Sequence, residues 1–155
     1  FAPDMKLKGI EEIRFAPGMF KPDVESFFSY AFVFWLPGDK PLDADTIHSE
    51  VLTYYRGLAK AVSKGEIKTD DFKLKLKPVE KQESEWVGTL EWIEPFRTRK
   101  AQTLRFEISQ RQLSEPDARL LSIAVSPQQD VKHAVWKDLR AILKNVTFAR
   151  IKAKN

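Results

Sequence analysis

The sequence predicts an α+β fold, in which a mostly antiparallel β-sheet of about five to six strands carries two amphipathic helices. Three observations lead to this prediction. Short segments of alternating apolar and polar residues dominate the chain, two longer segments repeat their apolar residues with helical spacing, and strands and helices do not alternate as in a parallel sheet. We expect residues 1–155 to form one globular domain, since 43% hydrophobic content can bury a core at this length without disulfides or metals.

Two strands and a helix are predicted in the first part of the chain. Residues 8–15 alternate in polarity, as in a strand with one solvated face. In residues 27–36, both the odd-numbered and the even-numbered positions are mostly apolar, which predicts a strand inside the sheet with both faces covered. Residues 43–64 follow a helical period. The candidate capping residues of this helix are Asp43 or Asp45 at its start and Gly65 at its end.

Three or four further strands and a second helix are predicted after residue 65. The strand segments are short and separated by turn residues, which favours an antiparallel meander. Their apolar cores are 72–76, 86–92, 104–108 and 120–125. Residues 135–146 return to helical spacing and close the chain with an amphipathic helix.

The order of these elements resembles that of the Mog1/PsbP-like α-β-α sandwich. The likeness is clearest where Leu120 to Ser126 is followed by Pro127-Gln128 and by the helix that contains Trp136. It covers the element order over most of the chain and includes no diagnostic motif. The resemblance implies an accessory or binding role, and it assigns no functional residue.

Several kinds of active site are excluded or disfavoured by composition. The chain has no Cys and only two His, so it has no thiol nucleophile, thiolate metal site or disulfide. All six glycines are isolated, and neither a nucleotide-binding loop nor a hydrolase GxSxG motif is present. We expect no metal and no cofactor.

A hydrolase-like enzyme without a recognisable motif is the third functional alternative, with His48, Glu91 and the tryptophans as its candidate parts. We expect His48 to be a surface histidine in the first turn of its helix and His133 to be solvated.

Four aromatic residues are candidates for ligand binding. Trp86 and Trp92 share one strand parity on either side of Gly88, and Tyr54 and Tyr55 lie on the first helix. Aromatic rings can stack on sugar rings or apolar ligands. The position of both tryptophans on the same strand face as Leu90 favours the alternative, in which they pack in the core. Tyr54 and Tyr55 have the same two alternatives on the helix.

Positive charge is concentrated near the C-terminus. The formal net charge is +4, but residues 95–155 hold 13 basic and 5 acidic side chains. Such clusters attract phosphates, anionic glycans or lipid headgroups, although a solvated helix face is also commonly charged. The candidate anion-binding residues are Arg97, Arg99, Lys100, Arg105, Lys137, Arg140 and Lys144. A basic tail follows at Arg150, Lys152 and Lys154.

The sequence favours a non-catalytic binding or accessory domain whose partner is another protein or an anionic polymer. The alternative is a nucleic-acid or anionic-polymer binder that uses the basic C-terminal surface. No apolar stretch is long enough to span a bilayer. Because the chain begins at Phe1 and not at Met, we expect a processed protein and favour a periplasmic or secreted location. The ligand and the oligomeric state are left open.

Overall fold

The computed structural model describes residues 1–114 and 117–146, so the basic tail lies outside the described residues. Six strands and two helices follow one another in the predicted order. Their bounds are β1 (Ile10–Phe15), β2 (Tyr30–Pro37), α1 (Ala44–Val62), β3 (Lys73–Val79), β4 (Gln82–Ile93), β5 (Ala101–Leu113), β6 (Ala118–Ser126) and α2 (Ala134–Lys144). No helix among them is long and apolar enough to cross a membrane.

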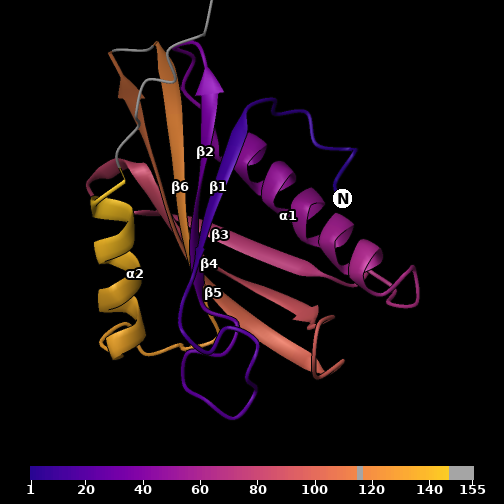
Figure 1. Ribbon diagram of the computed structural model, residues 1–155. Helices are drawn as coiled ribbons and strands as arrows, with labels where there is room; N and C mark the ends of the chain where they lie inside the picture. The colour runs from indigo at the N-terminus through magenta and orange to yellow at the C-terminus, as the bar shows by residue number, and fades with distance from the viewer. Residues whose placement is uncertain (115–116, 147–155) are drawn as a thin grey trace, which may run out of the picture.

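The strands form one twisted sheet in the order β1-β2-β6-β5-β4-β3, and every neighbouring pair is antiparallel. Figure 1 shows α1 on one side of this sheet and α2 on the other. The predicted α+β fold is therefore confirmed. We call the sheet face under α1 the inner face and the face under α2 the outer face. The larger core fills the space between α1 and the inner face, while α2 covers a smaller apolar cluster on the outer face.

β2 is covered on both faces, as its two apolar parities predict. Phe32 packs in the inner core, and Ala31 packs against α2. The strand begins at Tyr30, however, so the prediction that it starts at residue 27 is wrong. Phe28 has a φ of 51° and its N–H donates to the Met19 carbonyl at 2.9 Å, which makes it part of a buried turn.

Both ends of α1 are capped by the residues that the sequence predicts. The Asp43 side chain accepts from the Thr46 N–H at 2.7 Å, which satisfies one unpaired donor of the first turn. Gly65, at a φ of 83°, donates its N–H to the Lys60 carbonyl at 2.8 Å.

His48 is half-buried on α1, and its Nε2 lies 2.7 Å from the Leu74 carbonyl oxygen. The His48 ring therefore contacts β3.

His133 is more enclosed than the sequence suggests. It is half-buried and caps α2, where its Nδ1 accepts from the Val135 N–H at 3.1 Å. Its Nε2 lies 3.6 Å from Glu25 in the loop before β2. The expectation of a solvated His133 overlooked the capping position, because a histidine acceptor is less common there than Ser, Thr, Asp or Asn.

Candidate interaction surface

The loop between β4 and β5 is organised by one buried carboxylate. Glu94 is fully buried, and it accepts hydrogen bonds from the N–H groups of Phe96, Arg97 and Thr98 at 2.5 to 3.2 Å. The Thr98 hydroxyl donates to the same carboxylate at 3.0 Å, and the Glu94 N–H closes the loop on the Lys100 carbonyl. Because Glu94 satisfies these donors, the loop holds a defined shape that presents Phe96 and Arg97.

A second loop, residues 16–29, lies beside it. Gly18 has a φ of 87°, and a Cβ there would lie 2.6 Å from the Val24 side chain, so this turn requires glycine. The Ser26 hydroxyl bonds the Pro17 carbonyl across the loop. These contacts fold the loop back on itself and present Phe20 to solvent.

The two loops and the end of β1 bring three phenyl rings and one guanidinium together. The Phe20 ring lies 5.7 Å from the rings of both Phe15 and Phe96, measured between centroids. The Arg97 guanidinium carbon lies 5.9 Å from the centroid of Phe20. Phe15 is 52% exposed and Phe20 is 37% exposed. We call Phe15, Phe20, Phe96 and Arg97 the Phe20 patch.

The Phe20 patch has the composition of a binding surface. Large aromatic rings exposed together are costly to leave in water, and aromatic residues and arginine dominate the energetics of protein interfaces. Below the patch, Phe28 is buried against both Phe96 and Trp92. The patch therefore stands on the main core and is held in place by it.

The candidate ligand-binding aromatics lie elsewhere, within the inner core. Tyr54, Tyr55, Trp86 and Trp92 are all between 0% and 6% exposed. Tyr55 contacts the rings of Trp92 and Phe106 edge to face at 5.2 and 5.4 Å, and its hydroxyl bonds that of Tyr30. In this arrangement their faces contact other core side chains.

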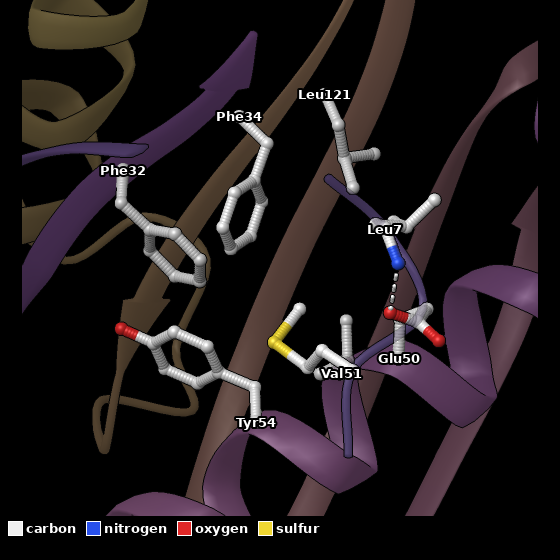
Figure 2. Close-up of a pocket in the computed structure, with 8 residues that line it drawn as sticks. Leu7, Phe32, Phe34, Glu50, Val51, Tyr54 and Leu121 are labelled. Carbon is white, nitrogen blue, oxygen red and sulfur yellow. Dashed lines mark hydrogen bonds between the residues drawn. The ribbon is translucent and has the colours of Figure 1, made fainter. Parts of the chain in front are cut away.

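Two small cavities lie at the surface of the described part of the chain. One lies under the N-terminal segment, where Met5 and Leu7 approach Tyr54 and Leu121, and its volume of about 10 Å³ is about that of one water (Figure 2). The other, of about 170 Å³, lies between the last turn of α2 and the outer faces of β1 and β2. Both are below the roughly 300 Å³ at which ligand pockets usually begin.

A second buried carboxylate closes the first cavity. Glu50 is 4% exposed, and its oxygens accept from the N–H groups of Lys6 and Leu7 at 3.0 to 3.1 Å. Figure 2 shows this contact between α1 and the N-terminal segment. Glu50 therefore has a structural role, in which it fixes residues 1–8 along the helix.

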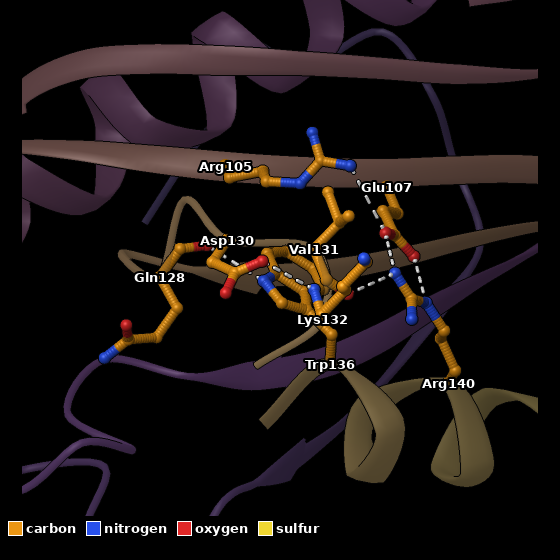
Figure 3. Close-up of polar contacts among 8 residues, drawn as sticks. All are labelled: Arg105, Glu107, Gln128, Asp130, Val131, Lys132, Trp136 and Arg140. Carbon is orange, nitrogen blue, oxygen red and sulfur yellow. Dashed lines mark hydrogen bonds and ion pairs between the residues drawn. The ribbon is translucent and has the colours of Figure 1, made fainter. Parts of the chain in front are cut away.

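The candidate anion-binding residues are divided among three elements, and one of them, Arg105, lies on β5. Those in the β4–β5 loop are Arg97, Arg99 and Lys100, and those on α2 are Lys137, Arg140 and Lys144. Arg99 pairs with Glu66 at 3.0 Å. On the outer face, Arg140 binds Glu107 through two bonds of 2.6 and 2.9 Å, and Arg105 reaches the same carboxylate at 3.4 Å (Figure 3). Three of the seven cations thus already have a carboxylate partner.

The candidate enzyme residues His48 and Glu91 lie on opposite faces of the sheet. Glu91 is exposed and alternates along β4 with Leu90 and Trp92, which are buried in the inner core. His48 lies on α1, on the inner side, and bonds a backbone carbonyl of β3. Within residues 1–114 and 117–146, no group of three or more His, Asp or Glu side chains could hold a metal ion.

Glu11 is a titratable group in an unusual environment. Burial raises its pKa above the ordinary value of 4.5, and the hydrogen bond that its carboxylate accepts from the Tyr54 hydroxyl at 2.7 Å, with the N-terminal charge, partly opposes this effect. Burial also raises the pKa of Tyr54. Tyr54 is therefore the proton donor of this pair.

The raised pKa of Glu11 makes stability depend on pH. Above 4.5 the folded chain holds this proton more tightly than the unfolded chain, so unfolding becomes easier as pH rises from 4.5 through the raised pKa. We expect Glu11→Gln to flatten this part of the curve. Urea unfolding midpoints between pH 4 and pH 7 would measure it, with the exposed Glu83→Gln as the control. Equal slopes in both variants would contradict the assignment.

The sequence did not reveal the Phe20 patch, although Arg97 was a candidate. Its rings come from a strand end and two separate loops, and no periodicity connects them. The one local signal is an aromatic residue inside a turn-rich segment, Phe20 after Pro17 and Gly18, where a buried role is uncommon.

No protein-family model matches this chain, and no curated protein matches it. Among solved structures it is similar to the 1.9 Å crystal structure of the Ran-binding protein Mog1p from Saccharomyces cerevisiae. The TM-score is 0.35 and the sequence identity 11%, over 92% of this chain and 74% of that chain. This similarity is to a protein of the family that the order of elements resembles.

Proposed function

We propose that this domain is a non-catalytic protein-binding module that holds its partner at the Phe20 patch. The observation that carries the proposal is the cluster of three phenyl rings and one arginine on two loops with internal bonds. Such a cluster matches the aromatic and arginine anchors that supply most of the binding energy in protein interfaces. A surface already ordered before binding also reduces the entropy lost on association.

The charge around the patch indicates the chemistry of the partner. Arg97 and Lys100 are exposed on the β4–β5 loop, and Lys21 is exposed next to Phe20. A partner segment with an apolar side chain flanked by Asp or Glu would satisfy both the rings and the cations. We therefore propose an acidic, partly apolar protein segment as the ligand.

A displayed library of random peptides, selected on the wild-type domain, tests this function. We expect enriched peptides to combine aromatic or aliphatic residues with Asp or Glu. Phe20→Ser should weaken their binding about tenfold or more, as at a hot-spot residue. Val131→Ser is the matched control, since Val131 is 43% exposed and lies outside the patch. Calorimetric titration of selected peptides gives the affinities.

Two results would reject this function. Peptides that bind Phe20→Ser as tightly as wild type would show that the patch is not the binding surface. Heparin or single-stranded DNA that binds at low salt, and is lost in Lys100→Glu but kept in Phe20→Ser, would favour the anionic-polymer alternative.

A further inference from the structure

The two edges of the sheet differ in how they are protected. β3 forms one edge and carries Lys73, Lys75 and Lys77 together with Pro78, and its pairing with β4 shifts register between Pro78 and Val79. Lysines, a proline and an irregular register are the usual means by which edge strands avoid pairing with another chain. The β3 edge is therefore blocked.

β1 forms the other edge and has none of these features. Its sequence, Ile-Glu-Glu-Ile-Arg-Phe, contains neither lysine nor proline. Ile10 is 56% exposed and Phe15 is 52% exposed, so an apolar side chain meets solvent at each end of the strand. Such an edge is suited to pairing with a further strand.

The hydrogen-bond pattern shows which backbone groups of β1 face outwards. The Ala16 N–H donates to the Ser29 carbonyl at 3.0 Å, in step with the β1–β2 register. Since the bonds alternate along an antiparallel pair, the backbone groups of Glu11, Ile13 and Phe15 point away from β2. The Arg14 guanidinium accordingly donates to the Ile13 carbonyl at 2.9 Å from the outer side.

The charges of β1 favour pairing with a second copy of itself in one register. In a sheet continued across a two-fold axis, two residues that lie opposite each other must be on the same face of the sheet. An odd-numbered residue of β1 therefore pairs with an odd-numbered residue of the second copy, and an even-numbered one with an even-numbered one. Pairing Ile13 with Ile13 of the second copy places Glu12 opposite Arg14 of that copy, and the axis repeats this contact. The alternative centred on Glu12 would place two carboxylates against each other.

We propose that this chain forms a two-fold dimer through β1, centred on Ile13, in which two six-stranded sheets join into one antiparallel sheet. Glu12 and Arg14 are both exposed and lie 3.4 Å apart within one chain, so they exchange this weak contact for two between chains. The outward backbone groups of Glu11, Ile13 and Phe15 gain partners in the second strand, and the Ile13 carbonyl exchanges its bond from the Arg14 guanidinium for one from the second copy.

Disulfide trapping tests the register, because the chain contains no cysteine. In Ile13→Cys the two thiols would face each other across the axis, with Cα atoms about 5.5 Å apart, within reach of a disulfide. We expect mild oxidation to yield a covalent dimer. Glu12→Cys is the control, because its two thiols would be diagonal neighbours and should crosslink far less. Crosslinking of Glu12→Cys in preference to Ile13→Cys would overturn the proposed register.

Sedimentation equilibrium tests the dimer without cysteines. Wild type should be dimeric, Glu12→Arg should raise the dimer dissociation constant about tenfold, and the charge swap E12R/R14E should restore it. A wild type that remains monomeric up to its solubility limit would overturn the proposal. Phe20→Ser should leave the dimer intact, so failure of the dimer and failure of the Phe20 patch are distinguishable.

Discussion

Glu94→Ala is expected to lower the free energy of unfolding by about 3 kcal/mol or more and to abolish peptide binding at the Phe20 patch. The substitution would leave three backbone N–H groups and the Thr98 hydroxyl without their acceptor inside the protein. Each unsatisfied buried donor costs about 1–3 kcal/mol, although water entering the loop would recover part of this cost. The loop would then no longer hold Phe96 and Arg97 beside Phe20.

Urea denaturation and peptide titration of the same protein measure the two effects. Glu91→Ala is the matched control, because Glu91 is an exposed carboxylate on β4, just before the loop that holds Glu94. Glu91→Ala should change the free energy of unfolding by less than about 0.5 kcal/mol and leave peptide binding unchanged. If Glu94→Ala and Glu91→Ala unfold at the same urea concentration, Glu94 does not organise the loop.

The second large effect is expected for Trp136→Ala, at about 3–5 kcal/mol of unfolding free energy. Trp136 is fully buried between α2 and the outer face of the sheet, together with Ala31, Ala124 and Leu139. Its Nε1 donates to the Gln128 carbonyl at 2.9 Å, and the Arg105 guanidinium lies 5.3 Å from its ring (Figure 3). Because the apolar cluster under α2 is small, removal of this ring takes away most of the apolar contact that holds α2 on the sheet.

Thermal unfolding followed by circular dichroism measures this loss, with the exposed Lys137→Ala as the control on the same helix. Trp136→Phe should be intermediate, since it keeps an aromatic ring but loses the hydrogen bond to Gln128. A Trp136→Ala variant as stable as Lys137→Ala would show that the cluster does not anchor α2.

The elements that could be predicted from the sequence are those whose pattern is local. The apolar spacing of α1 and its cap at Asp43 lie within one segment, and the structure agrees with both. The two apolar parities of β2 likewise required cover on two faces, which α1 and α2 supply. Periodicity reports where a side chain must point, so it is reliable wherever one face is buried.

The errors occurred where a distant segment changes the environment of a residue. Phe28 was expected in a strand, but a bond to Met19 places it in a turn. His133 was expected in solvent, but it caps α2 and its ring lies 3.6 Å from Glu25. The burial of Glu94 likewise has no local signal in the sequence, since it depends on how the β4–β5 loop closes around the carboxylate.

By itself, the sequence determined the α+β class, the order of the elements, the absence of cysteine chemistry and the excess of positive charge after residue 94. These properties follow from composition and from short-range periodicity. Only the tertiary structure decided that Phe15, Phe20, Phe96 and Arg97 form one patch, and that β1 is an unprotected edge of the sheet. The physical reason is that a patch and a sheet edge are defined by contacts between residues far apart in the chain, which no local pattern encodes.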